Sequence, residues 1–354
     1  MRTPGVLAVA ALAATVAACA TCPTGACPPV CVVTGAVSLP EASLMPGAAL
    51  AATGAGDLVA VYRGAGTLLV AKVTQAGTLR GSPVPLGVDA DRVAVASGGA
   101  GDLVLVGTPA ALTLFRTDAL GAVLEEIALP VAGVTAGAFD VAPTDDGFLL
   151  ASATATGIDV ARYDAAGAFL EGPLTFPGPD ATQPTALRLA RGAGDTFALV
   201  GAAATGLFWG RATLAGLEPP SFGVLEESAA AGALAVAAAA QHFVVAWGAG
   251  DAQVHGVAVP DEGAVLTLAR DAEGARPRLT LLADGRTLLA WADARGAHAV
   301  IVGDDGTPRG APADLGDVAF WGELAATENG AALLWAPIPA VGETDLNVSF
   351  LACE

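Results

Sequence analysis

Short apolar runs separated by polar turns recur along the whole chain. Seven units contain an equivalent run of four or five mostly apolar residues, and these runs start at Leu58, Leu103, Phe148, Phe197, Phe243, Thr287 and Ala331. Successive starts lie 44–49 residues apart. Short runs bounded by turn residues predict strands rather than helices. A fixed period in this range is typical of a solenoid, a propeller or another repeat array.

Other positions recur in phase with these runs. An apolar residue followed by a small one precedes each run, as in Leu50-Ala51 and Val141-Ala142. A basic residue lies in the third apolar run of the first four units, at Lys72, Arg116, Arg162 and Arg211. A turn glycine follows, at Gly77, Gly121, Gly167, Gly216, Gly263 and Gly306. Four strands in about 45 residues predict an all-β fold, a β-propeller of seven four-stranded blades, with six or eight blades as alternatives.

The first residues have the pattern of an export signal. Arg2 precedes an apolar run, Gly5 to Ala18, that is too short to span a membrane as a helix and ends in small residues. The sequence Val-Ala-Ala-Cys at positions 16–19 resembles the lipobox of bacterial lipoproteins. That resemblance implies an acylated Cys19 and a lipid anchor on a membrane. An ordinary signal peptide is the alternative.

These patterns divide the chain into three parts. We expect a signal peptide at residues 1–18, a lipidated cysteine-rich segment at 19–31 and a single propeller domain at 32–354. The expected location is the cell envelope, at the outer membrane or the periplasmic face, with the leaflet left open.

Four further cysteines lie near the two ends of the chain, at Cys22, Cys27, Cys31 and Cys353. An even number of cysteines in an exported chain implies disulfides. The last repeat stops at its third strand, Leu346 to Leu351, and the run Val32 to Leu39 is left without a repeat of its own. We therefore expect the N-terminal run to close the ring as the missing fourth strand. Cys353 would then pair with an N-terminal cysteine, Cys31 first, leaving Cys22 and Cys27 as the other bridge; metal binding by the N-terminal cysteines is the alternative.

Charge and composition narrow the partners. A net charge of −19 argues against nucleic acid and against docking on anionic lipid, which both require basic patches. The hydrophobic content is 54%, but no apolar run after the leader reaches 18 residues. The longest, Ala229 to Ala240, is in phase with a first strand, with a short helix as the alternative. The chain is expected to be a monomer that needs no cofactor.

Known catalytic patterns are absent from the sequence. It contains no G-x-S-x-G elbow, no H-E-x-x-H, no Walker loop and no EF-hand loop. His242, His255 and His298 occupy different places in their repeats, so we predict no metal site and no catalytic residues from motifs.

The most distinctive polar positions lie on the predicted innermost strands. Four of the seven residues that precede the apolar-small pairs are charged: Asp140, Arg188, Arg278 and Glu323. Neighbouring blades carry opposite signs, which predicts two interblade ion pairs, Asp140–Arg188 and Arg278–Glu323. The alternative is a polar channel that binds a small anionic or zwitterionic ligand, with Arg191 and Arg276 nearby.

The third unit, Val160 to Gly167 (VARYDAAG), resembles propeller repeats found in secreted bacterial proteins of undefined function. Such repeats specify an architecture and not an activity. The favoured hypothesis is a non-enzymatic binding scaffold for an envelope protein or glycan. The alternative is a hydrolase or lyase with a loop-built site, for which glycoside cleavage would require two nearby carboxylates. Its candidate carboxylates are Asp145, Asp146, Asp284, Asp293 and Asp304.

Overall fold

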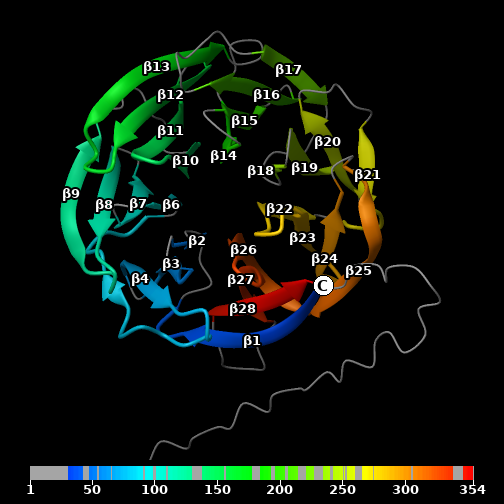
Figure 1. Cartoon of the computed structure of the whole chain (residues 1–354), viewed down its shortest axis with the longest axis horizontal. Helices are drawn as coiled ribbons and strands as arrows, with labels where there is room; N and C mark the ends of the chain where they lie inside the picture. Colours follow the sequence, from blue (N-terminus) through cyan, green and yellow to red (C-terminus); the bar gives the residue numbers. More distant parts are fainter. Residues whose placement is uncertain are drawn as a thin grey trace, which may run out of the picture.

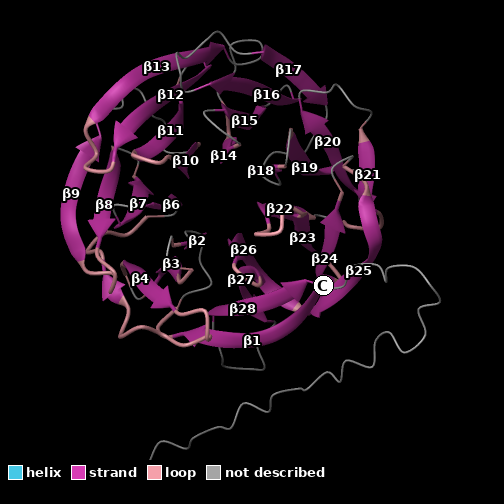
Figure 2. Cartoon of the chain, in the orientation of Figure 1, coloured by secondary structure: helices cyan, strands magenta, loops and turns pink. Residues whose placement is uncertain are grey.

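The computed structural model contains seven four-stranded antiparallel sheets arranged as blades around a central channel (Figure 1). Strands and loops make up the described part of the chain (Figure 2), which has no helix long and apolar enough to cross a bilayer. The described residues are 31–42, 48–53, 56–64, 66–90, 92–98, 101–108, 111–129, 138–154, 157–177, 184–192, 196–203, 206–213, 221–226, 234–239, 242–249, 251, 253–259, 265–273, 275–303, 306–337 and 346–353.

Each of the first six blades is one stretch of chain, with its strands in sequence order from the channel outwards. Blade 1 contains β2 (Ala49–Ala52), β3 (Leu58–Arg63), β4 (Leu68–Val73) and β5 (Val84–Pro85). Blade 2 contains β6 (Arg92–Gly98), β7 (Gly101–Gly107), β8 (Leu112–Thr117) and β9 (Val123–Leu129). Blade 3 contains β10 (Phe139–Pro143), β11 (Gly147–Ala153), β12 (Gly157–Asp164) and β13 (Phe169–Pro177). Blade 4 contains β14 (Ala186–Arg191), β15 (Thr196–Ala203), β16 (Gly206–Thr213) and β17 (Ser221–Glu226). Blade 5 contains β18 (Leu234–Ala238), β19 (Phe243–Ala249), β20 (Gln253–Val259) and β21 (Leu266–Ala269). Blade 6 contains β22 (Arg276–Leu281), β23 (Thr287–Asp293), β24 (Gly296–Val302) and β25 (Pro308–Gly316).

Blade 7 joins the two ends of the chain. It is built from β26 (Val318–Thr327), β27 (Gly330–Pro337), β28 (Leu346–Cys353) and, as its outermost strand, β1 (Cys31–Leu39). The pairing of β1 with β28 begins at Cys31 and Cys353, which form a disulfide, and ends at Leu39 and Leu346. The predicted seven blades, ring closure and Cys31–Cys353 bridge are confirmed. Cys19, Cys22 and Cys27 lie outside the described residues.

The second strand of each blade is mostly apolar because it is covered on both faces. In β11 every residue is buried, and β19 and β23 are buried up to their last residue. The buried side chains form seven clusters, each between two neighbouring blades. Trp247 lies between blades 4 and 5, Trp291 between blades 5 and 6, and Tyr62 between blades 7 and 1. Their recurrence at one repeat position reflects this interblade packing.

The repeated Asp-x-x-Gly sequence makes the turn between the third and fourth strands. In blade 2, Asp118 Oδ1 accepts hydrogen bonds from the backbone N–H groups of Leu120 and Ala122, at 2.8 and 2.9 Å. Gly121 has a φ of 88°, which glycine adopts without steric cost. A Cβ at this position would lie 3.3 Å from the Val70 side chain in blade 1, so the turn also packs on the preceding blade.

The topology places two sets of turns on the same face of the ring. Because the strands of a blade alternate in direction, the turns from first to second strand and from third to fourth strand lie on one face of the ring. We call it the hairpin face. The Cys31–Cys353 bridge lies there too, where Arg286 Nη2 donates to the Cys353 carbonyl oxygen at 2.8 Å.

Over the described residues Leu234–Ala238, the alanine-rich run Ala229 to Ala240 is strand β18, so the helical alternative is wrong there.

Candidate functional site in the central channel

The seven innermost strands place equivalent residues at one level of the channel. These are the residues that the repeat aligned: Ala49, Ala94, Asp140, Arg188, Ala235, Arg278 and Glu323. All seven line a cavity of about 160 Å³, together with aliphatic neighbours such as Leu50, Val141 and Leu189. The small residues on three blades leave the space that the four charged side chains share.

Glu323 is the centre of the charged cluster. Its Oε1 accepts a hydrogen bond from Arg188 Nη2 at 2.9 Å, and its Oε2 lies 3.0 Å from Arg278 Nε. Arg278 belongs to the neighbouring blade 6, so the predicted Arg278–Glu323 pair is confirmed. Arg188 lies on β14 of blade 4, and Figure 1 shows this strand on the other side of the channel from β26, which carries Glu323. This contact joins opposite sides of the ring, and the channel is therefore crossed by an ion-pair bridge.

The other predicted pair, Asp140–Arg188, is wrong. Although both residues are described, their charged groups form no ion pair; Asp140 Oδ2 instead accepts the backbone N–H of Leu189 at 2.8 Å. Asp140 and Arg188 lie on neighbouring strands, but the long arginine side chain extends towards Glu323. Burial raises the pKa of Asp140 to about 6, against the opposing effect of the Arg188 charge and the Leu189 hydrogen bond.

A second, wider cavity of about 340 Å³ lies on the hairpin-face side of the charged cluster. Leu50, Val95, Val141 and Leu189 line both cavities, so the two are consecutive compartments of one channel. The described residues that line the wider compartment are mainly small and aliphatic, and one of them, Arg191, is charged. Arg276, the other arginine predicted near the site, is exposed at the start of β22 and belongs to neither lining.

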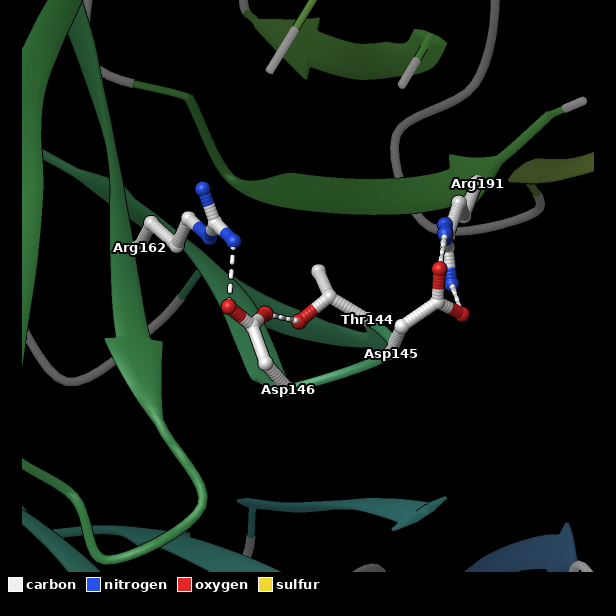
Figure 3. Close-up of polar contacts among 5 residues, drawn as sticks. All are labelled: Thr144, Asp145, Asp146, Arg162 and Arg191. Atoms are coloured by element: carbon white, nitrogen blue, oxygen red, sulfur yellow. Dashed lines mark hydrogen bonds and ion pairs between the residues drawn. The ribbon is translucent and has the colours of Figure 1, made fainter. Parts of the chain in front are cut away.

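Arg191 is held at the channel mouth by the hairpin of blade 3. Its Nη1 and Nη2 atoms donate to the two carboxylate oxygens of Asp145, at 2.8 and 2.9 Å (Figure 3). In the same hairpin, Asp146 accepts from Arg162 at 2.5 Å and from Thr144 at 3.1 Å. The arginine partners lower the pKa of both carboxyl groups.

The remaining candidate carboxylates for catalysis also have local partners. Asp284 accepts from Arg286 Nε at 2.7 Å, and this bond lowers its pKa. Asp293, in the β23–β24 turn on the opposite face, lies 3.4 Å from Arg295 Nη2. Asp304 lies outside the described residues. Carboxyl groups with lowered pKa values stay ionised at neutral pH, which makes Asp145, Asp146 and Asp284 poor general acids.

Two of the three histidines, His255 and His298, occupy equivalent positions in their blades, so the expectation that all three differ was wrong. His255 stacks near Trp247 and its Nε2 lies 3.1 Å from Asp251; His298 stacks near Trp291 and its Nε2 lies 3.5 Å from Asp293. Each histidine is paired in strand register with its tryptophan. Across the described ranges, no three His, Cys, Asp or Glu side chains are grouped as a metal site.

An apolar patch on the outer edge of blades 2 and 3 was not predicted from the sequence. Its members are large and 38–62% exposed: Leu120, Val123, Leu124, Phe169 and Leu170. Val123 and Leu124 of blade 2 are equivalent in the repeat to Phe169 and Leu170 of blade 3. They flank the third-to-fourth-strand turns on the hairpin face. The blade 3 turn packs on the outer strands of blade 2, since a Cβ on Gly167 would lie 2.7 Å from Ile127 in β9. The signal was present in the repeated Gly-Ala-(Val/Phe)-Leu-Glu sequence at positions 121–125 and 167–171, but exposure depends on the tertiary structure.

A buried interblade ion pair was also missed. Lys72 of blade 1 and Asp102 of blade 2 are 3% and 5% exposed and their charged groups are in contact. Ser97 donates to the second Asp102 oxygen at 2.5 Å. Burial lowers the pKa of Lys72 to about 8. The sequence showed a recurring basic residue in third strands, but not its acidic partner on the next blade.

Comparison with known proteins identifies the architecture. No family model matches the sequence, and no curated protein matches it. Among solved structures, the chain is similar to BBS1N in complex with ARL6DN, soaked with lead, at 14% identity and a TM-score of 0.58 over 88% of this chain and 94% of that one. The mercury-soaked crystal of the same complex matches with 14% identity and a TM-score of 0.59, over 92% of this chain and 97% of that one. At this identity the likeness shows the fold alone: the chain is a seven-bladed β-propeller.

Proposed function

We propose that this protein is a non-enzymatic propeller lipoprotein, anchored in the cell envelope, that acts as a scaffold for a protein partner. The observation that carries the proposal is the apolar patch formed by Leu120, Val123, Leu124, Phe169 and Leu170. Large apolar side chains exposed at equivalent positions of neighbouring blades are candidates for an interaction site, because apolar surface on a folded protein often marks one. The propeller of BBS1N, which has the same fold, was solved in complex with ARL6DN, a use consistent with scaffolding.

The chemistry of the patch indicates the kind of partner. Glu125 and Glu126 follow the apolar residues of blade 2 and are exposed, and the chain carries a net charge of −19. A complementary surface would combine an apolar centre with lysine or arginine at its edge. Glu125 is paired with Arg116 at 2.7 Å, so it is the net negative charge of the chain that disfavours an anionic lipid surface. The proposed partner is therefore a protein.

The proposed anchor would orient this patch. The segment that carries Cys19 joins the ring at Cys31, on the hairpin face. Twelve residues extend at most about 40 Å, so acylation of Cys19 would hold the hairpin face towards a membrane. The proposed partner is accordingly an envelope protein exposed close to the bilayer.

Removing the patch tests the scaffold. We expect Leu124→Ser/Phe169→Ser to weaken capture of the partner by about tenfold or more, because large central apolar residues dominate binding energy. The measurement is quantitative cross-linking and pull-down of the tagged protein from native envelopes. The matched control is Val32→Ser/Val33→Ser on β1, where both residues are exposed by 41% and 44%. Equal capture by the two variants would refute a role for the patch, and flotation with vesicles in the absence of protein would identify lipid as its target instead.

Acylation is tested separately. We expect labelled fatty acid to be incorporated by the wild-type protein and not by Cys19→Ala, because the cysteine thiol is the acylated group in the lipobox that residues 16–19 resemble. Envelope fractionation of the same two proteins gives an independent readout. Label that persists on Cys19→Ala, or never appears on the wild type, would exclude the lipoprotein and leave the patch proposal standing.

A further inference from the structure

The charged level of the channel has hydrogen-bonding groups that the protein does not use. The Asp140 carboxylate accepts the backbone N–H of Leu189 through Oδ2, and the backbone N–H of Val141 is its second donor. A carboxylate has about four acceptor sites, so these two bonds leave acceptor capacity on Asp140. The Arg188 guanidinium has five N–H donors, of which one binds Glu323. The Arg188 side chain is 31% exposed, and because β14 is an innermost strand this exposure is to the channel.

The unused groups have opposite charges and lie on neighbouring blades. The Asp140 carboxylate touches the backbone beside Arg188, whereas the Arg188 guanidinium extends over the channel to Glu323. With two arginines and two carboxylates, the cluster is close to neutral as a whole. A simple anion in the cavity would face Asp140 and Glu323, and a simple cation would face both arginines. A ligand that carries both charges meets complementary groups at each end.

The volumes and the lining residues of the two compartments indicate the size and the polarity of a ligand that would fit. A cavity of about 160 Å³ has room for about five water molecules at roughly 30 Å³ each, which is enough for a compact charged head. The wider compartment of about 340 Å³ begins at Leu50, Val95, Val141 and Leu189. Together they reach the size range of small-molecule sites, which are mostly apolar with a few placed polar groups.

We propose that the channel binds a free α-amino acid with an aliphatic side chain. The ligand's ammonium group donates to Asp140, its carboxylate accepts from Arg188 and Arg278, and its side chain lies among Leu50, Val95, Val141 and Leu189 towards the hairpin face. Glu323 positions both arginines. This site is separate from the apolar patch and does not depend on the proposed partner or anchor.

The test compares leucine with two analogues that each lack one charge. 4-Methylpentanoate has no ammonium group, and 3-methylbutylamine has no carboxylate. For the purified full-length protein we expect saturable leucine binding by equilibrium dialysis, with a Kd below about 1 mM. Each analogue should bind at least about tenfold more weakly, because it leaves a charged group without a partner. Lysine and glutamate should also bind weakly, since their side chains place a charge against the aliphatic level.

A protein variant assigns the ammonium contact. Asp140→Asn keeps an oxygen to accept the Leu189 N–H, yet removes the charge that faces the ammonium group. We expect it to lose leucine binding at least about tenfold while its affinity for 4-methylpentanoate stays the same or rises. Val32→Ser/Val33→Ser on the outermost strand β1 serves as the control and should bind leucine normally.

Three results would overturn the proposal: no saturable binding of any aliphatic amino acid, equal binding of leucine and 4-methylpentanoate, or unchanged leucine binding by folded Asp140→Asn. The first would leave the cluster as a structural bridge only. If Asp140→Asn does not fold, the analogue series on the wild-type protein decides alone. Partner capture by the apolar patch is measured independently, so either proposal can fail without the other.

Discussion

Glu323→Gln lowers the free energy of unfolding by about 3 kcal/mol, the lower end of the range for breaking a buried ion pair. The variant leaves the guanidinium groups of Arg188 and Arg278 facing each other in the channel without their shared carboxylate. The lower end applies because the three side chains are 12–31% exposed, so channel water compensates part of the loss. The loss is measured as the shift of the urea midpoint followed by tryptophan fluorescence.

Two further variants isolate the cause. Glu328→Gln neutralises an exposed glutamate just beyond the same strand, and its effect should stay within about 0.5 kcal/mol. Replacing Arg188, Arg278 and Glu323 together with Met removes the bridge and its charges at once. Because well-packed apolar residues can replace a buried network at little cost, the triple variant should regain most of the stability that Glu323→Gln loses. A triple variant as unstable as the single one would show that packing, and not uncompensated charge, causes the loss.

Cys31→Ser/Cys353→Ser destabilises the ring by up to about 5–6 kcal/mol in the chain-entropy treatment of disulfides. The bridge joins residues separated by 322 positions, so it restricts nearly the whole unfolded chain. It also holds the beginning of β1 on the end of β28, where blade 7 has no continuous turn between its third and fourth strands. The effect is measured by urea unfolding, with hydrogen exchange of the β1 and β28 peptides as a local readout.

The expected local result is faster exchange in β1, because only its backbone pairing with β28 then keeps the ring closed. Cys22→Ser/Cys27→Ser is the control, since a bridge between these residues would close a short loop and restrict little of the chain. Reducing agent should have little further effect on Cys31→Ser/Cys353→Ser. An unchanged urea midpoint and unchanged β1 exchange in that variant would contradict a closing role for the bridge.

The blade pattern was predictable because the packing is local and repeated. Each blade buries its second strand against two neighbours, so the same apolar run must recur in every unit, ending in Tyr62, Trp247, Trp291 or Trp335 in four of them. Ring closure followed from counting the predicted strands. The last repeat lacked a fourth strand, and the N-terminal run Val32 to Leu39 belonged to no repeat, so pairing the two completed the last blade. Cysteines at the free ends of those two strands then had to meet.

The channel was predictable in position and only partly in its contacts. Equivalent positions of a repeat occupy equivalent places in a ring, so Asp140, Arg188, Arg278 and Glu323 were expected at one level. Adjacency in the repeat predicted the Arg278–Glu323 pair and failed for Asp140–Arg188. The failure has a physical reason: a long arginine side chain in a narrow channel can reach a blade on the far side, and one carboxylate can bind two guanidinium groups.

By itself, the sequence determined the strand period, a blade count between six and eight with seven favoured, and the strand that closes the ring. It also indicated Cys31 as the first choice among the N-terminal cysteines to pair with Cys353. All of these depend on the order of apolar, small and turn residues along the chain. The tertiary structure alone decided which charges pair across the channel, that Lys72 pairs with Asp102, and that Leu124 and Phe169 remain exposed on neighbouring blades. Side-chain contacts between blades depend on how far each side chain extends, and exposure depends on what packs over it. Neither can be read from the order of residues in a repeat.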